Sequence, residues 1–480
     1  MALQSLCRTG PRARGPAARP PRRDAPLIPR FRDSVRRLLP LAWPVWIGQL
    51  AVMLFSTVDT LMLGRVGPVD LAALAVGSAA YITIFVGLMG VVLAVGPMVG
   101  RQFGARDLPA AGRHLVQAQW LALLACVPGC AVLLWPEPFV WLARLDPALA
   151  DKVAAYTRPL AIALPFALLT TAFRGFANAV SRPKAVMALQ LGGLALKVPL
   201  NALLVFGWGP LPAMGVAGCA WATTLVMALQ AACAQALLRR DPFYRPFSVP
   251  HLWDTRPDWK ALAAQLRLGL PMGGSILVEV TGFTFMAFFI ARLGATAVAG
   301  HQIAVNLVAM MFMMALALGT AGQTLVAQHI GAGQWGHARA VGRHALLLCA
   351  ALAAVLGGLV AGARAPVVAL YTDNAEAAAA ALPLLVWIWF FHLGDAVQTV
   401  SASVLRAHHV ATLPMVIYVL ALWGVGIGGG YWLAFGPPGL GAVGFWSAAT
   451  AGLLTAATLL VALQVWVERQ EAPPPVTSAG

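Results

Sequence analysis

The sequence predicts an all-α integral membrane protein whose twelve transmembrane helices form two parallel-repeat six-helix bundles. Three observations support this fold class. Hydrophobic residues make up 60% of the 480 residues and charged residues 10%, at a mean hydropathy of +0.78, whereas about 25% of the residues of a soluble protein are charged. Apolar stretches long enough to cross a bilayer recur along the chain. The second half of the chain also repeats the first.

Each predicted helix is an apolar stretch of about 20 residues, the length that a bilayer core of about 30 Å requires at 1.5 Å per residue. Polar breaks separate these stretches. They begin near residues 38, 71, 115, 156, 184, 213, 265, 295, 344, 378, 413 and 442. Because their number is even, both ends of the chain are expected on the same side of the membrane.

The predicted domain boundaries follow from these stretches. The bundles are residues 38–238 and 263–467, joined at 239–262 by a charged cytoplasmic linker with four prolines. Residues 1–37 are rich in Arg and Pro and predict a disordered basic cytoplasmic arm, with an organelle transit peptide as the alternative. Residues 468–480 are the expected cytoplasmic tail.

The net charge of +16 is unevenly distributed. If the N-terminus is cytoplasmic, 26 of the 33 Lys and Arg residues fall in or beside cytoplasmic segments, which is the positive-inside bias of membrane proteins. We therefore expect both termini in the cytoplasm. The basic charge then reports orientation and does not indicate a nucleic-acid partner.

Three pairs of segments reveal the internal repeat. PVWIGQLAVMLFSTVDTLMLGRVG (44–67) aligns with PMGGSILVEVTGFTFMAFFIARLG (271–294), and the same spacing aligns FGA (103–105) with IGA (330–332). A spacing one position shorter aligns MGVAGCAWATT (214–224) with LGAVGFWSAAT (440–450). Six helices per repeat make the halves parallel, related by an axis along the membrane normal. Transporters built this way bind substrate near the midplane between the bundles.

Glu279 is the strongest functional signal, because it is the one carboxylate in the apolar run between Arg267 and Arg292. It lies 12 residues after the first arginine and 13 before the second, about 18 to 20 Å from either along a helix. An ionised carboxylate at that depth costs at least about 2.5 to 3.5 kcal/mol. We expect Glu279 to face a cavity or a partner, or to hold a proton; the alternative is a protonated Glu that bonds a neighbouring helix.

Asp395 is the expected partner of Glu279. It lies 11 residues before Arg406, about 16 Å from the cytoplasmic end and again near mid-depth. Gln398 and Thr399 extend its polar face at i+3 and i+4. Two carboxylates at one depth in one bundle repel each other, which favours a shared proton or cation.

A second buried pair is predicted in the first bundle. Asp59 lies six residues before Arg65, and Lys197 lies 13 residues after Lys184, about 20 Å into the membrane. An ammonium at that depth needs a carboxylate, so we predict an Asp59–Lys197 ion pair with Asn201 one turn further along. The alternative is that Lys197 reaches outward to the surface.

Other polar residues give weaker signals. Gln302 and Asn306 are an i, i+4 pair in the eighth span. His301 is expected near the outer interface, since no Cys, His or carboxylate stands beside it at ligand spacing. His408 and His409 are expected at the cytoplasmic surface. The six cysteines contain no CxxC pair and are interpreted as small buried hydrophobes.

Residues 38–467 resemble the multidrug and toxic compound extrusion (MATE) family, and within it the NorM-like branch. The resemblance rests on PVWIGQLAVMLFSTVDTLMLGRVG with Asp59, LPMGGSILVEVTGF with Glu279, AGHQIAVNL, and GDAVQTVSASVLR with Asp395. It implies the MATE fold, a V of two six-helix bundles that alternates between inward and outward states and exports organic cations against Na+ or H+. It also implies a cation site at Glu279 and Asp395, with Asp59 serving the first bundle.

The chain departs from the family pattern at two positions. Relatives can carry a tyrosine one turn before the tenth-span acid, where this chain has Phe391 and lacks the hydroxyl. Relatives often have an asparagine in the fifth span, where this chain has Lys197, whose ammonium can imitate a bound cation beside Asp59. We therefore expect coupling to rest on Glu279 and Asp395.

These observations predict a secondary active multidrug exporter, not an enzyme, that works by alternating access as a monomer in the bacterial inner (plasma) membrane. Its expected partners are small organic cations and membrane lipid. No cofactor is expected beyond Na+ or H+, and no metal beyond a Na+ at Glu279 and Asp395. Aromatic and methionine side chains are the expected lining of an apolar cleft, with simple packing as the alternative: Phe283, Phe285, Met310, Met311 and Met313.

Two other functions have weaker support. A lipid-linked precursor flippase of the same superfamily would need several cations in its cavity, and only Lys197 is expected at depth. An integral membrane transferase would need a polar catalytic cluster near the membrane surface or in a soluble loop, and the sequence offers none. The substrates, the choice between Na+ and H+, and the titration of Asp59 stay open.

Overall fold

The computed structural model describes residues 29–135, 137, 146–208 and 212–471, and these are helical almost throughout, with no strand. Eleven helices in this described part are long and apolar enough to cross a membrane, and a bent pair supplies the twelfth span. The predicted fold class is therefore confirmed. The predicted basic arm at 1–37 and tail at 468–480 lie largely outside the described residues.

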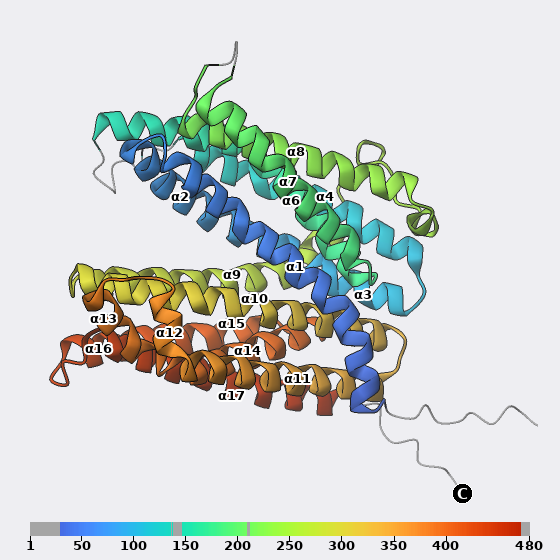
Figure 1. Cartoon of the computed structure of the whole chain (residues 1–480). Coiled ribbons are helices and arrows are strands. Elements are labelled where there is room, and N and C mark those ends of the chain that lie inside the picture. Colours follow the sequence, from blue (N-terminus) through green and yellow to red (C-terminus); the bar gives the residue numbers. More distant parts are fainter. Residues whose placement is uncertain (1–28, 136, 138–145, 209–211, 472–480) are drawn as a thin grey trace, which may run out of the picture.

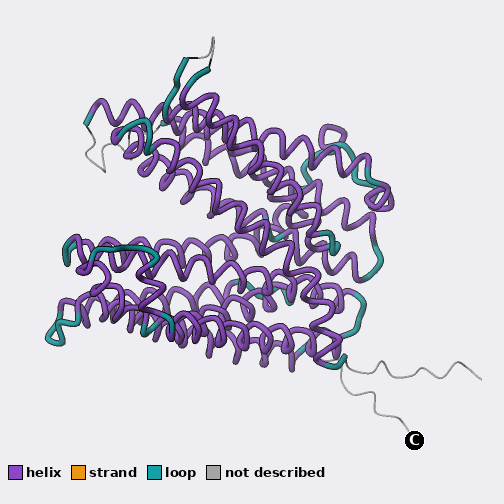
Figure 2. Tube along the Cα trace, in the orientation of Figure 1, coloured by secondary structure: helices purple, strands orange, loops and turns teal. Residues whose placement is uncertain are grey.

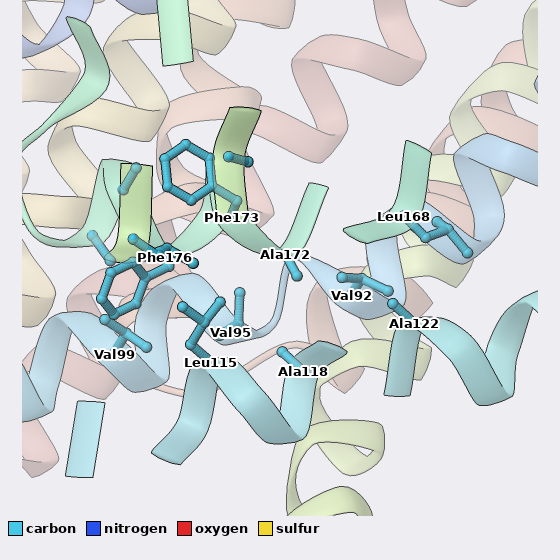
Figure 3. Close-up of a cluster of buried hydrophobic side chains, with 14 of the residues drawn as sticks. Val92, Val95, Val99, Leu115, Ala118, Ala122, Leu168, Ala172, Phe173 and Phe176 are labelled. Carbon is cyan, nitrogen blue, oxygen red and sulfur yellow. The ribbon is translucent and has the colours of Figure 1, made fainter. Parts of the chain in front are cut away.

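The first bundle contains six spans, because α2 and α3 together form one. Its helices are α1 (Phe31–Leu63), α2 (Pro68–Val92), α3 (Val95–Gly104), α4 (Leu108–Leu134), α6 (Pro147–Ala179), α7 (Pro183–Phe206) and α8 (Val216–Arg240). Its largest core joins the end of α2 with α3, α4 and α6 (Figure 3), through Val92, Val95, Val99, Leu115, Ala118, Ala122, Leu168, Ala172, Phe173 and Phe176.

The second bundle also contains six spans, two of them interrupted. Its elements are α9 (Trp259–Ala291), α10 (Ala295–Gly331), α11 (Trp335–Gly362), α12 (Arg364–Ala369), α13 (Ala375–Leu385), α14 (Ile388–Ala407), α15 (Thr412–Tyr418), the π-helix Val419–Gly428, α16 (Gly429–Phe435) and α17 (Gly441–Gln470). The chain bends by 52° between α13 and α14. A π-helical segment this long is uncommon and follows α15 directly.

Several helices begin well before the residues that hydropathy predicts. α4 begins at Leu108 and not near 115, because Asp107 caps it by accepting a hydrogen bond from the Ala110 N–H at 3.0 Å, and Pro109 fits the first turn. α6 and α11 likewise begin earlier than expected, at Pro147 and Trp335. Hydropathy marks the bilayer core, whereas the helices extend beyond it.

The linker predicted at 239–262 is structured. Short 3-10 helices span Pro242–Phe247 and Leu252–Asp254. Tyr244 and Phe247 are buried against the core of the first bundle, and the Arg182 guanidinium lies 4.0 Å from the centre of the Phe243 ring. The linker therefore covers the first bundle and is not a loose tether.

The two bundles form a V (Figures 1 and 2). They meet at the end where α1 begins and α17 ends, and they separate toward the opposite end. Hydrogen bonds join them at the closed end: Arg101 Nε donates to the Ala407 carbonyl at 3.0 Å, and Gln328 Nε2 donates to the Ala179 carbonyl at 2.7 Å.

Each bundle also begins against the other. The first turns of α1 place Leu38 and Ala42 in a core made mostly by α10, α11 and α14. The start of the first bundle's first helix therefore packs in the core of the second bundle. The first turns of α9 pack in the same way against α4, where Gln265 Nε2 donates to the His114 carbonyl at 3.0 Å. Because the internal repeat makes α1 and α9 equivalent helices, each packs its first turns against the opposite bundle.

Two glycines that the repeat relates to each other form the closed crossing. A Cβ on Gly104 would lie 1.9 Å from the Gln328 carbonyl oxygen, and a Cβ on Gly331 would lie 1.9 Å from the Arg101 carbonyl oxygen. The spacing that aligns FGA with IGA pairs Gly104 with Gly331 and also pairs Arg101 with Gln328. The FGA and IGA segments are thus the contact between bundles, and their glycines let two backbones touch.

We predict that Gly104→Ala or Gly331→Ala opens this end. A methyl group so close to backbone forces the crossing helices apart by more than about 1 Å, because packed backbone cannot yield as a flexible side chain does. Spin labels are attached at Ala105→Cys and Ala332→Cys in a background without the native cysteines. Double electron–electron resonance should then report a longer distance between the two labels than in the protein with both glycines. Gly336→Ala is the matched control, since a Cβ there meets nothing within 4 Å; unchanged distances in the first two variants would contradict the prediction.

The histidines after α14 differ from each other in environment. His408 was expected at the surface but is buried, and its Nδ1 lies 2.6 Å from Glu471 Oε2 at the end of α17. His409 is exposed and takes the left-handed conformation, with φ of 61°. The expectation was wrong for His408 because the end of α17 covers it.

We predict that the His408–Glu471 contact makes stability pH-dependent. Burial raises the pKa of the Glu471 carboxyl, but the hydrogen bond from His408 and the charges of His408, Arg101 and His409 lower it more, and the net pKa is below the ordinary value. Its contribution is thus fully present above the unfolded pKa of about 4.3 and is lost as the pH falls through the lowered value. The Tm deficit of Glu471→Gln should be the same at pH 7 and pH 5 and should shrink only as the pH falls below about 4, whereas exposed Glu376→Gln should show no deficit.

Candidate functional site

A cavity of about 460 Å³ lies between the bundles. Its walls come from α1, α2, α3 and α6 of the first bundle and from α9, α10, α14 and α15 of the second. Such a volume is that of a site for a drug-sized ligand. The lining is mostly apolar, with side chains that include Val45, Val86, Met89, Ile276, Phe283, Phe312 and Met313.

Glu279 and Asp395 meet at this cavity, as their predicted depth requires. Both line it, from α9 and α14. Gln398 lies between them: its Nε2 is 3.0 Å from Asp395 Oδ1 and 3.4 Å from Glu279 Oε1. The predicted polar face therefore exists, because positions i and i+3 of α14 point the same way.

Tyr418 is a member of this network that sequence reasoning missed. It is the last residue of α15, and its hydroxyl donates to Gln398 Oε1. Tyr418 thus brings a hydroxyl to this network from α15. Phe391 itself is buried, with its ring centre 5.2 Å from that of Trp446. A tyrosine one turn after Pro414 in an apolar span was the only available signal.

The network can hold one positive charge. The Gln398 NH₂ group has two hydrogens, and three oxygens lie within reach, on Glu279, Asp395 and Thr399, the last at 3.1 Å. The oxygens therefore outnumber the donor hydrogens by one. A proton on one carboxyl, or a monovalent cation held by the oxygens, would supply the missing positive contact and relieve the repulsion between the carboxylates. No group of three or more His, Cys, Asp or Glu in the described part of the chain is placed to hold a metal ion.

The ion pair predicted in the first bundle is present. Lys197 Nζ lies 2.9 Å from Asp59 Oδ1, and Asn201 Nδ2 donates to the same oxygen at 2.6 Å. Lys197 also donates to Thr223 and is fully buried, which excludes the alternative of an outward-reaching side chain. None of these residues lines the cavity between the bundles.

The polar residues at the start of the eighth span do not line the cavity. Gln302 and Asn306 are exposed and outside the cavity, and Asn306 accepts a hydrogen bond from Tyr371 at 3.0 Å. His301 is buried in the second turn of α10, where its Nδ1 accepts from Trp446 Nε1 at 3.2 Å. It therefore packs inside the bundle, near the end of α10 that begins at Ala295.

The predicted apolar cleft needs a correction. Phe283 and Met313 line the cavity as predicted, but Phe285 and Met310 are exposed and Met311 belongs to the core of the second bundle. The neighbouring residue Phe312, which was not predicted, also lines the cavity. Each step along a helix turns the side chain by about 100°, so the sequence alone could not select the correct face in a span that is apolar all round.

Two arginines at the closed end of the cavity were also missed. Arg174 of α6 and Arg406 of α14 both line it. Their positions in the sequence had placed them among the cytoplasmic charges that set orientation. Arg406 shares the lining face of α14 with Asp395, Thr399 and Ser403, so one helix face carries charges of both signs.

Comparison with known proteins agrees with this geometry. The MatE family model matches the chain twice, at residues 44–203 and 271–432, and the two matches begin at Pro44 and Pro271, which the internal repeat aligns. The chain is similar to the probable multidrug resistance protein NorM of Aromatoleum aromaticum, with 40% identity over 427 residues that cover 88% of this chain and 92% of the relative. It is 34% identical over 436 residues to multidrug resistance protein PmpM of Pseudomonas aeruginosa, covering 90% of this chain and 91% of the relative.

Solved structures share the fold. The bent form of the Vibrio cholerae MATE transporter VcmN matches with a TM-score of 0.81 and 17% identity over 92% of this chain and 98% of that one. The eukaryotic MATE transporter AtDTX14 matches with a TM-score of 0.82 and 19% identity over the same shares. The repeated family match and the two relatives described above agree with the shared fold. The chain belongs to the MatE family, the multidrug and toxic compound extrusion transporters, and within it to the NorM-like branch.

Proposed function

We propose that the chain is a secondary active multidrug exporter that exchanges organic cations for Na+ or H+ by alternating access. It works as a monomer in the bacterial inner membrane, with both termini in the cytoplasm. The observation that carries the proposal is the carboxylate pair of Glu279 and Asp395, which lines a drug-sized cavity between two bundles. The names of its relatives, multidrug resistance proteins, support the same function.

Competition for the carboxylates provides the coupling. With the termini in the cytoplasm, the open end of the V faces outward, so an ion from outside reaches Glu279 and Asp395. Once the ion neutralises the pair, a cationic substrate loses its electrostatic partner and leaves to the outside. In the inward state the ion dissociates and the next substrate binds, and the difference in affinity between the two states supplies the direction.

The apolar lining favours flat, lipophilic cations. Phe283 and Phe312 present aromatic rings to the cavity, and ring faces attract cations by about 0.5 to 2 kcal/mol. Met89 and Met313 add flexible side chains that adapt to ligands of different shape. A cavity of this kind selects for charge and general size, which is the requirement of a multidrug site.

The first bundle carries no exchangeable charge in this mechanism. Lys197 already neutralises Asp59 at 2.9 Å, with Asn201 and Thr223 completing the hydrogen bonds. A transported ion would have to displace an ammonium that is covalently attached to the chain. Coupling therefore rests on the second bundle.

Electrostatics also separates this proposal from a lipid-linked precursor flippase. A pyrophosphate in the cavity would lie beside Glu279 and Asp395, and like charges at close range cost several kcal/mol in a medium of low dielectric constant. The two arginines at the closed end do not remove the carboxylates from the path. The exporter is the function that this charge pattern favours.

We predict that Glu279→Gln and Asp395→Asn each reduce export more than about tenfold, because losing a hydrogen bond to a charged group costs about 1.5 to 3 kcal/mol and about 1.4 kcal/mol is a factor of ten. The measurement is uptake of a fluorescent organic cation by everted vesicles that contain high Na+ or high H+, with one gradient imposed at a time. The gradient that drives uptake identifies the ion.

The exposed carboxylate Glu376, mutated to Gln, is the control for this experiment and should leave transport unchanged. If both cavity variants transport normally at equal expression, the carboxylates are structural. If neither gradient drives uptake by the native protein, antiport is the wrong mechanism.

We also predict that the Asp59–Lys197 pair supports folding and not coupling. Lys197→Met leaves a buried carboxylate unpaired and should destabilise the protein by about 3 to 5 kcal/mol, which thermal unfolding in detergent detects. The double variant Asp59→Asn with Lys197→Met removes both charges and should recover most of the lost stability together with gradient-driven transport. A stable double variant without transport would assign Asp59 a role in coupling.

A further inference from the structure

A stripe of exposed side chains runs along the first turns of α1. Arg36 is followed at helical spacing by Leu39, Trp43 and Trp46, and positions three, seven and ten residues apart lie on one side of a helix. Trp43 is 45% exposed and Trp46 is 40% exposed. About 10 Å of helix separates Arg36 from Trp43. A cation is therefore followed, further into the membrane, by an apolar and aromatic surface.

This stripe points away from the cavity between the bundles. Val45 and Gln49 of α1 line that cavity, and Trp43 lies two residues before Val45, which is a turn of about 200° around the helix. Leu38 and Ala42 occupy a third side of α1, in the core of the second bundle. The stripe therefore faces neither the cavity nor the other bundle, and its surroundings in a membrane are lipid.

The neighbouring helix α7 adds a second cation beside the stripe. Lys184 lies in the first turn of α7, and its Nζ is 5.9 Å from the centre of the Trp43 ring. The two helices touch closely at Gly48, where a Cβ would lie 2.0 Å from Gln190 Oε1. This packing holds Lys184 and Trp43 at the same level. The contact with the ring positions the ammonium but does not neutralise its charge.

The charges and donors of this surface have no protein partner. Arg36 and Lys184 form no ion pair and no hydrogen bond with any residue that the structure describes. The indole N–H groups of Trp43 and Trp46 likewise donate to none of the described residues. Two positive charges and two N–H donors are therefore free to bind a ligand from outside the chain.

The internal repeat shows that the fold itself does not require these side chains. For Arg36 and Trp43, the spacing that aligns α1 with α9 gives the counterparts. For Lys184, the reference is the left-handed residue three positions earlier, Ser181, which matches His409 after α14. The counterparts in the second half are neither basic nor aromatic: Ala263, Leu270 and Thr412. The surface is thus a feature of the first half alone.

An anionic phospholipid has the chemistry that complements this surface. Its phosphate accepts hydrogen bonds from a guanidinium and an ammonium. Its ester carbonyls lie at the interfacial level that tryptophans prefer and can accept from their N–H groups, while an acyl chain covers Leu39 and the rings. The cationic headgroup of a zwitterionic lipid would instead be repelled by Arg36 and Lys184.

We propose that Arg36, Trp43 and Lys184 form a binding site for one anionic phospholipid in the leaflet at the closed end of the V. The start of α1 packs in the second bundle and the helix then crosses to the first (Figure 1). A headgroup held by both Arg36 and Lys184 joins this start to α7, so bound lipid stabilises the protein with its bundles in contact. The inference goes beyond the proposed export function and does not depend on the transported substrate.

Thermal unfolding of the purified full chain in detergent tests the site. Dioleoylphosphatidylglycerol is titrated in parallel with dioleoylphosphatidylcholine, which has the same chains and no net charge. We expect the anionic lipid to raise the Tm at much lower concentration than the zwitterionic one. Arg36→Gln and Lys184→Gln should each raise the concentration of the anionic lipid at half-maximal shift about fivefold, and the double variant more than about tenfold. In the absence of lipid their Tm should equal that of the native protein, because both side chains are exposed.

Control variants and a soluble ligand complete the test. Arg113→Gln removes another exposed arginine, on α4, and should leave the lipid response unchanged, and Lys184→Arg keeps the charge and should retain the response. Glycerol 1-phosphate, which has the phosphate without the chains, should give no shift.

Two results would overturn the site. If the double variant responds to the anionic lipid as the native protein does, Arg36 and Lys184 do not bind it. If glycerol 1-phosphate shifts the Tm as strongly as the lipid, the surface binds a soluble anion and the lipid assignment is wrong. Neither result bears on the export proposal, because the measurement involves no transport.

Discussion

The cost of placing charge inside an apolar membrane protein governs this structure. A charged side chain at the bilayer centre must find a partner, water or a proton, and the chain uses a different solution at each site. Asp59 and Lys197 neutralise each other in the first bundle. Glu279 and Asp395 share one amide nitrogen of Gln398 and face a cavity. The charges of the first pair are matched inside the bundle, whereas those of the second pair line a cavity, and this is why the proposed mechanism places ion coupling at the second pair.

The internal repeat preserves the contacts between the two bundles but not the buried acidic residues. In the alignment that pairs Pro44 with Pro271, Glu279 corresponds to Val52 and Asp59 corresponds to Met286, so neither acid has a counterpart in the other half. The glycines of the closed crossing, in contrast, do correspond, and each contacts the other half in the same way. Symmetry is therefore kept where the two bundles touch and lost where the buried charges lie.

Depth along a helix was the part of the site that the sequence could predict, because a constant rise per residue located Glu279 and Asp395 from flanking arginines. The direction in which each side chain points around the helix axis was not predictable, because a span that is apolar on all sides has no polar face that indicates its orientation. Met311 was therefore predicted alongside Met313 although only Met313 lines the cavity, and Phe312 and the Tyr418 hydroxyl were missed. Contacts between distant segments were equally out of reach. The packing of α1 on the second bundle and the burial of the linker's aromatic rings depend on which surfaces are available, and composition does not describe those.

The closed end is the contact that must open if the molecule changes state as proposed. The bundles touch there through backbone at Gly104 and Gly331, and apolar side chains of both bundles, such as Leu93 and Met272, pack beside the crossing. The bonds across the contact run from Arg101 and Gln328 to carbonyl groups, and each such bond contributes about 0.5 to 3 kcal/mol. Water can replace these partners when the end opens. In the proposed mechanism, an ion that neutralises the carboxylate pair shifts the equilibrium between the closed and open states of this end by its difference in affinity for the two states.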